Sequence, residues 1–147
     1  MFLILHNIRS VYNVGSIFRT ADGADVEKIY LCGYTPTPAK KTALGAEATV
    51  PWEHCAQTWR LLKKLKTAGI RIVALEQYKY SQDLFGYTPK EPMALVVGNE
   101  VRGLNNAIFK YTDDILEIPM HGQKESLNVA VAAGIVLYYV RNKLQER

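Results

Sequence analysis

The residues best suited to chemistry fall in three short segments, and the first runs from Asn13 to Ala21. Asn13 is a candidate N-cap for a helix, Gly15 leaves room above the first turn, and Arg19 lies one turn further on. A guanidinium can hold a phosphate group through two parallel hydrogen bonds. The segment therefore predicts a phosphate contact, and the ordinary alternative is an arginine on a solvated helix surface.

The second segment runs from Leu95 to Leu104, where an apolar run ends in Gly98 and is followed by Asn99 and Glu100. A glycine at the end of a strand lets the backbone approach a ligand closely. Taken alone, the same pattern is equally typical of an ordinary connection from a strand to a helix.

The third segment runs from Ile118 to Ala130 and places a polar, glycine-bearing loop between an apolar run and a final helix. Ser126 is the expected N-cap of that helix. Asn128 is the last polar residue before a long apolar stretch, so it either caps the helix or contacts a ligand.

These segments need a scaffold, and the apolar periodicity predicts alternating strands and helices. We expect strands at 2–5, 28–32, 70–75, 93–97 and 115–118, helices at 14–24, 53–68, 104–109 and 127–143, and loops at 33–51 and 78–92. Such alternation predicts an α/β fold with a mostly parallel sheet and helices on both faces. In the second helix we expect Trp59, Leu62 and Leu65 to point inward, and Gly69 to end the helix.

The final predicted helix is apolar on almost every side between Val129 and Val140. A surface helix of a small protein normally shows a single apolar stripe. The pattern therefore favours a homodimer formed through this helix, and the alternative is a helix buried at the centre of one chain.

Composition narrows the class of protein. The chain has 147 residues, 48% of them hydrophobic, and a formal net charge of +4, which fits one globular domain with a mild preference for nucleic acid. Cys32 and Cys55 lack the spacing of a disulfide framework or zinc site, so we expect no metal. Without a signal peptide or a membrane-spanning run, the sequence predicts a soluble cytoplasmic protein.

In this order, the three segments resemble the motifs of the SpoU/TrmH family of SPOUT RNA 2′-O-ribose methyltransferases. The motif N-x-G-x-x-x-R-T-A matches Asn13 to Ala21, and G-N-E-x-x-G-L matches Gly98 to Leu104. The motif I-P-M-x-G-x-x-x-S-L-N-V matches Ile118 to Val129. The resemblance spans nearly the whole chain, and the one departure is Val11-Tyr12, where relatives often carry a proline.

The resemblance implies a catalytic domain over residues 1–147 with a C-terminal trefoil knot. Family members often carry a further RNA-binding domain, but because this chain starts directly at the first predicted strand, we expect none here. It also implies that S-adenosyl-L-methionine is bound in the knot and leaves as S-adenosyl-L-homocysteine. The residues expected to contact it are Leu75, Gly98, Ile118, Met120, Ser126 and Leu127.

The resemblance further implies that Arg19 is the central catalytic residue, surrounded by Asn13, Glu100, Ser126 and Asn128. Because a guanidinium stays protonated in proteins, we favour Arg19 as a phosphate clamp and oxyanion stabiliser over a general base. Glu100 would orient Arg19 or accept the proton. The cations expected to contact the RNA backbone are Arg9, Lys40, Lys41, Arg102 and Lys124.

The motifs leave the substrate open between tRNA and ribosomal RNA. A non-catalytic RNA-binding dimer with the same fold is a further alternative. A small NAD-dependent oxidoreductase is disfavoured, because no G-x-G-x-x-G fingerprint follows the first predicted strand.

Overall fold

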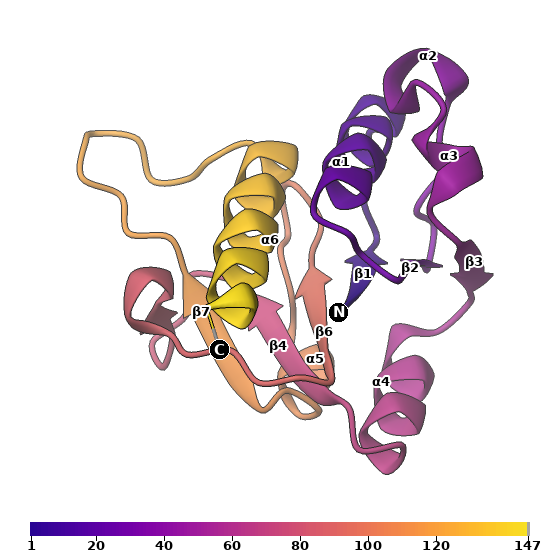
Figure 1. Cartoon of the computed structure of the whole chain (residues 1–147). Helices are drawn as coiled ribbons and strands as arrows, with labels where there is room; N and C mark the ends of the chain where they lie inside the picture. The colour runs from indigo at the N-terminus through magenta and orange to yellow at the C-terminus, as the bar shows by residue number, and fades with distance from the viewer. Residues whose placement is uncertain (147) are drawn as a thin grey trace.

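The computed structural model describes residues 1–146 and contains one sheet of seven strands (Figure 1). The strand order is β3-β2-β1-β6-β4-β7-β5, and every strand pairing in the sheet is parallel. The strands are β1 (Phe2–His6), β2 (Lys28–Cys32), β3 (Trp52–Cys55), β4 (Arg71–Leu75), β5 (Gln82–Asp83), β6 (Met93–Val97) and β7 (Asp114–Glu117). The prediction of a parallel α/β sheet is confirmed.

Helices cover both faces of this sheet, as the sequence predicted. They are α1 (Val11–Gly23), α2 (Lys40–Ala43), α3 (Ala46–Thr49), α4 (Thr58–Thr67), α5 (Asn106–Phe109) and α6 (Val129–Gln145), with a 3-10 turn at Leu84–Gly86. In β1, Leu3 and Leu5 join the core beneath α1 and α6, whereas Ile4 joins the core beneath α4. Successive strand residues point to opposite faces, so one apolar strand supports both layers.

Two predicted N-caps were wrong, and each lies within three residues of the true cap. Helix α1 is capped by Ser10, whose hydroxyl accepts a hydrogen bond from the Asn13 N–H at 3.2 Å. Helix α6 is capped by Asn128, whose side-chain oxygen accepts from the Ala130 N–H at 2.9 Å. Ser126, the predicted cap, precedes the helix. Serine and asparagine are almost equally good caps, so residue type alone does not separate neighbouring candidates.

The predicted helix over 53–68 was wrong in its first third. Residues 52–55 form β3, which pairs with β2 at the edge of the sheet, and α4 begins only at Thr58. The buried side of α4 includes Leu61, Leu62 and Leu65, while Trp59 keeps 39% of its surface exposed. Gly69 follows the helix with φ of 82°, the left-handed conformation expected at this end.

The segment predicted as a loop over 33–51 contains two short helices that pack on α1. A β carbon at Gly15 would run into the Thr42 side chain, so the room above this glycine is filled by α2. Ala43, Ala46 and Val50 are buried in the core on the same side. Residues 33–51 are therefore not a free loop, because part of this segment packs against α1 and contributes to the hydrophobic core.

Helix α6 lies on the surface, so it is not buried at the centre of this chain. Ala133, Val136 and Val140 face the core, whereas Val131 and Tyr138 are each 53% exposed. Within residues 1–146, no helix is both long enough and apolar enough to cross a membrane. The homodimer and the trefoil knot stay predictions.

Candidate functional site

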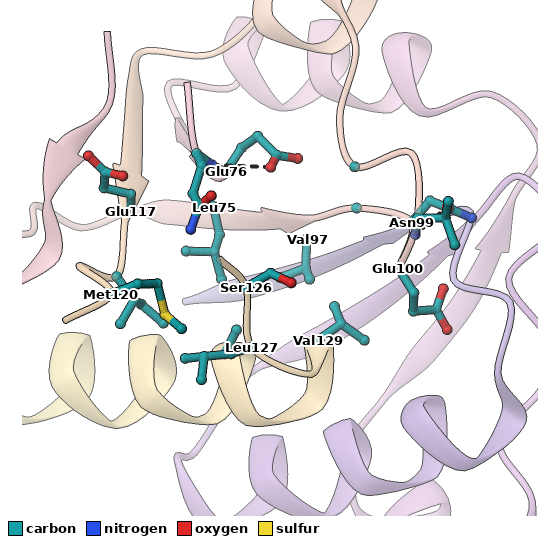
Figure 2. Close-up of a pocket in the computed structure, with 16 residues that line it drawn as sticks. Leu75, Glu76, Val97, Asn99, Glu100, Glu117, Met120, Ser126, Leu127 and Val129 are labelled. Atoms are coloured by element: carbon teal, nitrogen blue, oxygen red, sulfur yellow. Dashed lines mark hydrogen bonds between the residues drawn. The ribbon is translucent and has the colours of Figure 1, made fainter. Parts of the chain in front are cut away.

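A pocket of about 240 Å³ opens where β4, β6 and β7 end (Figure 2). Parallel α/β sheets bind ligands at the carboxyl ends of their strands. The six residues predicted to contact the cofactor all line this one pocket: Leu75, Gly98, Ile118, Met120, Ser126 and Leu127. The structure thus brings together residues that are up to 52 positions apart in the sequence.

The lining of the pocket combines apolar side chains with carboxylates. Val97 and Val129 add to the apolar surface, and Glu76, Glu100 and Glu117 place acidic groups around it. Sequence reasoning missed both Glu76, which directly follows the predicted strand 70–75, and Glu117, which lies within the predicted strand 115–118 and ends β7 in the structure. An apolar pocket with carboxylates at its edge suits a ligand that joins a flat apolar group to a cation.

The turn after β6 explains why residue 98 is glycine. A β carbon there would lie 2.7 Å from the Gly103 carbonyl carbon and 2.6 Å from a Leu104 methyl group. The sequence predicted that the backbone of Gly98 approaches a ligand closely. In the structure, Gly98 is instead in close contact with the turn at Gly103 and Leu104. The Glu76 carboxylate accepts a hydrogen bond from the Leu104 N–H at 2.8 Å and holds this turn against β4.

Asn99 joins three loops beneath the site, although sequence reasoning gave it no role. Its side-chain NH₂ donates to the Asn7 carbonyl oxygen and to the Tyr34 hydroxyl, both at 2.8 Å. Its side-chain oxygen accepts from the N–H groups of Val101 and Arg102. Only 6% of Asn99 is exposed, and four hydrogen bonds satisfy its amide. The signal available in the sequence was an asparagine directly after the glycine that ends an apolar run.

Glu100 binds the loop that leads into α1. Its carboxylate accepts from the N–H groups of Arg9 at 2.8 Å and Ser10 at 2.9 Å, and from the Asn13 side-chain NH₂ at 3.0 Å. Burial raises the pKa of the Glu100 carboxyl, but these three hydrogen bonds outweigh it and hold the pKa below its usual value. The carboxylate is thus suited to fixing the loop and poorly suited to accepting a proton.

We expect Glu100→Gln to lower the free energy of unfolding by about 1 kcal/mol, because the amide faces N–H donors with only one acceptor oxygen. A lowered pKa stabilises the fold above the unfolded-state value of 4.5, and this contribution is lost as pH falls through the folded-state pKa. The difference in Tm between wild type and variant should therefore shrink from pH 6 to pH 3. Calorimetry across this range measures it, and a difference independent of pH would contradict the assignment.

A hydrogen bond connects the first and third sequence segments. The Asn128 side-chain NH₂ donates to the Asn13 side-chain oxygen at 3.2 Å, while the Asn128 oxygen caps α6. Glu100, Asn13 and Asn128 thus form one continuous network at the edge of the pocket. Ser126 lies on the adjoining loop and lines the pocket itself.

Arg19 is the predicted catalytic residue that one chain does not bring to the pocket. It is exposed on α1, and within residues 1–146 its side chain has neither a hydrogen bond nor an ion pair. It lies six positions after Asn13 in the helix, which corresponds to about 9 Å along the helix axis. Its guanidinium is therefore available to a phosphate or to a pocket outside its own chain.

The five cations predicted to bind RNA are all exposed, and none forms an ion pair within residues 1–146: Arg9, Lys40, Lys41, Arg102 and Lys124. The Arg9 N–H donates to the Glu100 carboxylate, and the Arg102 N–H donates to the side-chain oxygen of the neighbouring Asn99. Lys40 and Lys41 lie on α2. Lys124 lies on the loop before α6.

The sequence of this chain is similar to those of known RNA methyltransferases. The model of the SpoU rRNA Methylase family matches residues 1–138. The putative TrmH family tRNA/rRNA methyltransferase YacO of Bacillus subtilis is 34% identical over 97% of this chain and 58% of its own length. The tRNA (guanosine(18)-2′-O)-methyltransferase of Aquifex aeolicus is 31% identical over the whole chain and 71% of its own length. The chain thus spans under two thirds of the first relative.

Solved structures of related enzymes have the same fold as this chain. The A. aeolicus TrmH/SpoU tRNA modifying enzyme superposes with a TM-score of 0.92 at 30% identity, covering 99% of this chain and 75% of the other. The AdoMet-bound rRNA methyltransferase from Sinorhizobium meliloti gives 0.89 at 30% identity, covering 97% of this chain and 56% of the other. With the family model matching residues 1–138, the chain belongs to the SpoU rRNA methylase family.

Proposed function

We propose that this chain transfers a methyl group from S-adenosyl-L-methionine to a ribose 2′-hydroxyl of tRNA or ribosomal RNA. The observation that carries the proposal is the pocket, which is lined by all six residues expected to hold the methyl donor. The names of the relatives support the reaction, since the A. aeolicus protein is a tRNA 2′-O-methyltransferase and the S. meliloti structure holds AdoMet. The proposed trefoil knot would shape this pocket.

The residues of the pocket fit such a donor. When bound, it supplies an electrophilic methyl group on a positively charged sulfur. Leu75, Ile118 and Leu127 offer apolar contacts for its adenine ring, and the carboxylates of Glu76 and Glu117 complement its positive charges. These residues would position the donor, and positioning two bound substrates can lower the reaction barrier by several kcal/mol.

The role of Arg19 follows from the charge that develops during transfer. The 2′-oxygen becomes partly anionic as it attacks, and a guanidinium beside it stabilises that charge and a neighbouring phosphate. Glu100 is not the base in this proposal, because its two oxygens already accept three hydrogen bonds. Asn13 and Asn128 would hold the entrance of the pocket in position for the ribose.

Because one chain leaves Arg19 away from the pocket, we propose a homodimer through α6 in which a second copy supplies this guanidinium. The exposed apolar residues Val131 and Tyr138 support an interface on this helix. The exposed cations around the Glu100 network and on α2 would then contact the RNA backbone. We also propose a cytoplasmic location, where such RNA is found.

We expect Val131→Asp to convert the dimer to a monomer and to abolish methylation. Val131 is the third residue of α6, where an acidic side chain interacts favourably with the helix dipole, so the helix itself should remain intact. Val131→Thr, which keeps the shape of the side chain, is the control and should remain dimeric. Sedimentation velocity measures the effect, and a dimeric, active Val131→Asp variant would contradict an interface on α6.

The proposed function is tested by titration calorimetry with S-adenosyl-L-methionine and by transfer of a tritiated methyl group to bulk unmodified tRNA and ribosomal RNA. Digestion to nucleosides should place the label on the ribose 2′-oxygen. Binding of RNA without binding of the methyl donor would instead identify the non-catalytic RNA-binding dimer. Label on a base would overturn the proposed reaction.

A further inference from the structure

Helix α4 presents a basic and aromatic surface that the candidate site does not use. Trp59, Arg60, Lys63, Lys64 and Thr67 line a shallow hollow along its outer side, and we call these five residues the α4 surface. The Arg60 guanidinium lies 5.3 Å from the centre of the Trp59 ring. The surface thus combines a partly exposed indole with three cations on little more than two helical turns.

The cations of the α4 surface are not balanced by the protein. The helix has no acidic residue, and its one ion pair within the described chain is that of Lys66 with Asp113, outside the surface. Arg60, Lys63 and Lys64 therefore repel one another at spacings of three and four residues. No acidic side chain in the described part of the chain forms an ion pair with any of these three cations.

Helix stability does not explain the position of Arg60 or the exposure of Trp59. Lysines near the end of α4, such as Lys64, interact favourably with the helix dipole. Arg60, however, lies in the first turn, where a cation is unfavourable. The packing of α4 on the sheet uses Leu61, Leu62 and Leu65, so the Trp59 ring is not needed for the core.

We infer that the α4 surface is a second RNA-binding surface, in which Trp59 stacks on an unpaired base and the cations contact adjacent phosphates. Aromatic rings beside cations are the usual means of binding single-stranded segments. The inference rests on the proposed function, because an enzyme that modifies RNA must hold an RNA longer than the methylated nucleotide. Charge complementarity favours this polyanion over other partners.

The position of the α4 surface predicts which RNA will use it. Helix α4 packs on the face of the sheet opposite α1 and α6, and Figure 1 shows it well apart from the loop before α6. A short oligonucleotide in the pocket would not reach this face, whereas a folded RNA of tRNA size can extend around the edge of the sheet. The surface should therefore affect KM for long RNA only.

The test compares binding of fluorescein-labelled bulk tRNA to Trp59→Ala, Trp59→Phe and Lys63→Gln by fluorescence anisotropy. Trp59→Ala should weaken tRNA binding at least about fivefold, which is the smallest effect usually seen on removing one stacked base. Trp59→Phe keeps an aromatic ring and should retain most of the wild-type affinity. Lys63→Gln should reduce the slope of log K against log salt by about 0.7–0.9, as expected for one phosphate contact. Lys90→Gln removes an exposed lysine that has no ion pair within the described residues and lies outside both the pocket and the α4 surface, so it is the charge-matched control and should bind as wild type.

Enzyme kinetics and calorimetry separate this inference from the proposed function. The α4 variants should raise KM for tRNA, leave kcat unchanged and bind S-adenosyl-L-methionine as wild type does. If wild type transfers no methyl group but the α4 variants still bind tRNA more weakly, only the proposed function fails. Equal tRNA binding by all variants, or α4-dependent binding to phosphatidylserine vesicles without binding to tRNA, would overturn the second RNA surface.

Discussion

The Arg19→Ala variant should lose methyl transfer by about 10²–10³-fold in kcat, the usual effect of removing one group that stabilises a developing oxyanion. Its affinity for S-adenosyl-L-methionine should not change, because Arg19 does not line the pocket. The fold should also be unaffected, since the side chain is exposed and has no hydrogen bond within residues 1–146. Single-turnover kinetics and calorimetry measure these two properties separately.

Two further variants sharpen this prediction. Arg19→Lys keeps the charge but loses the planar pair of donors, so it should recover only a small part of kcat. Lys110→Ala, which also removes an exposed cation, should leave kcat unchanged. Wild-type turnover in Arg19→Ala would exclude Arg19 from the reaction.

Mixed dimers distinguish whether Arg19 acts in its own chain or across the dimer. One chain carries Arg19→Ala and has an intact pocket. The other chain keeps Arg19 but carries a substitution in the pocket that prevents cofactor binding. If the guanidinium crosses the interface, co-expression of the two inactive chains creates one complete site in each mixed dimer and restores activity. If it acts within its own chain, every mixed dimer stays inactive.

Strands and motifs were predictable because their signals are local. The apolar runs at 28–32 and 93–97 form β2 and β6 with the predicted bounds, since continuous apolar runs are typical of parallel strands buried on both faces. The pocket followed from the motif resemblance together with the rule that the carboxyl ends of parallel strands meet at one edge. The six predicted cofactor contacts could therefore be named without knowledge of any side-chain contact.

The errors arose where contacts between distant residues decide the structure. Strand β3 pairs with β2 although residues 53–55 were predicted to begin a helix, because the edge of the sheet supplies their hydrogen-bond partners. Glu100 lies 90 residues from Ser10, and Asn128 lies 115 residues from Asn13. Nothing in the sequence around Glu100 shows that its carboxylate is occupied by the loop before α1.

The Gly98→Ala variant should lose cofactor binding, although the change adds only one methyl group. The new β carbon would lie 2.7 Å from the carbonyl carbon and 2.8 Å from the carbonyl oxygen of Gly103, so the turn after β6 must move. That turn carries Asn99 and Glu100 and forms one wall of the pocket. Overpacking of this kind costs about 1–3 kcal/mol. If this cost destabilises the cofactor-bound protein and not the free protein, it corresponds to roughly a 5- to 150-fold loss of affinity.

The matched control is Gly86→Ala, because a β carbon at Gly86 meets no atom within 4 Å and its backbone has no positive φ. This variant should bind S-adenosyl-L-methionine as wild type does. The double variant Gly98→Ala/Leu104→Ala tests the cause, because it removes the contact with the leucine methyl but not the clash with the Gly103 backbone, and should stay defective. If calorimetry shows normal affinity in Gly98→Ala, or full rescue by Leu104→Ala, the backbone clash does not shape the pocket.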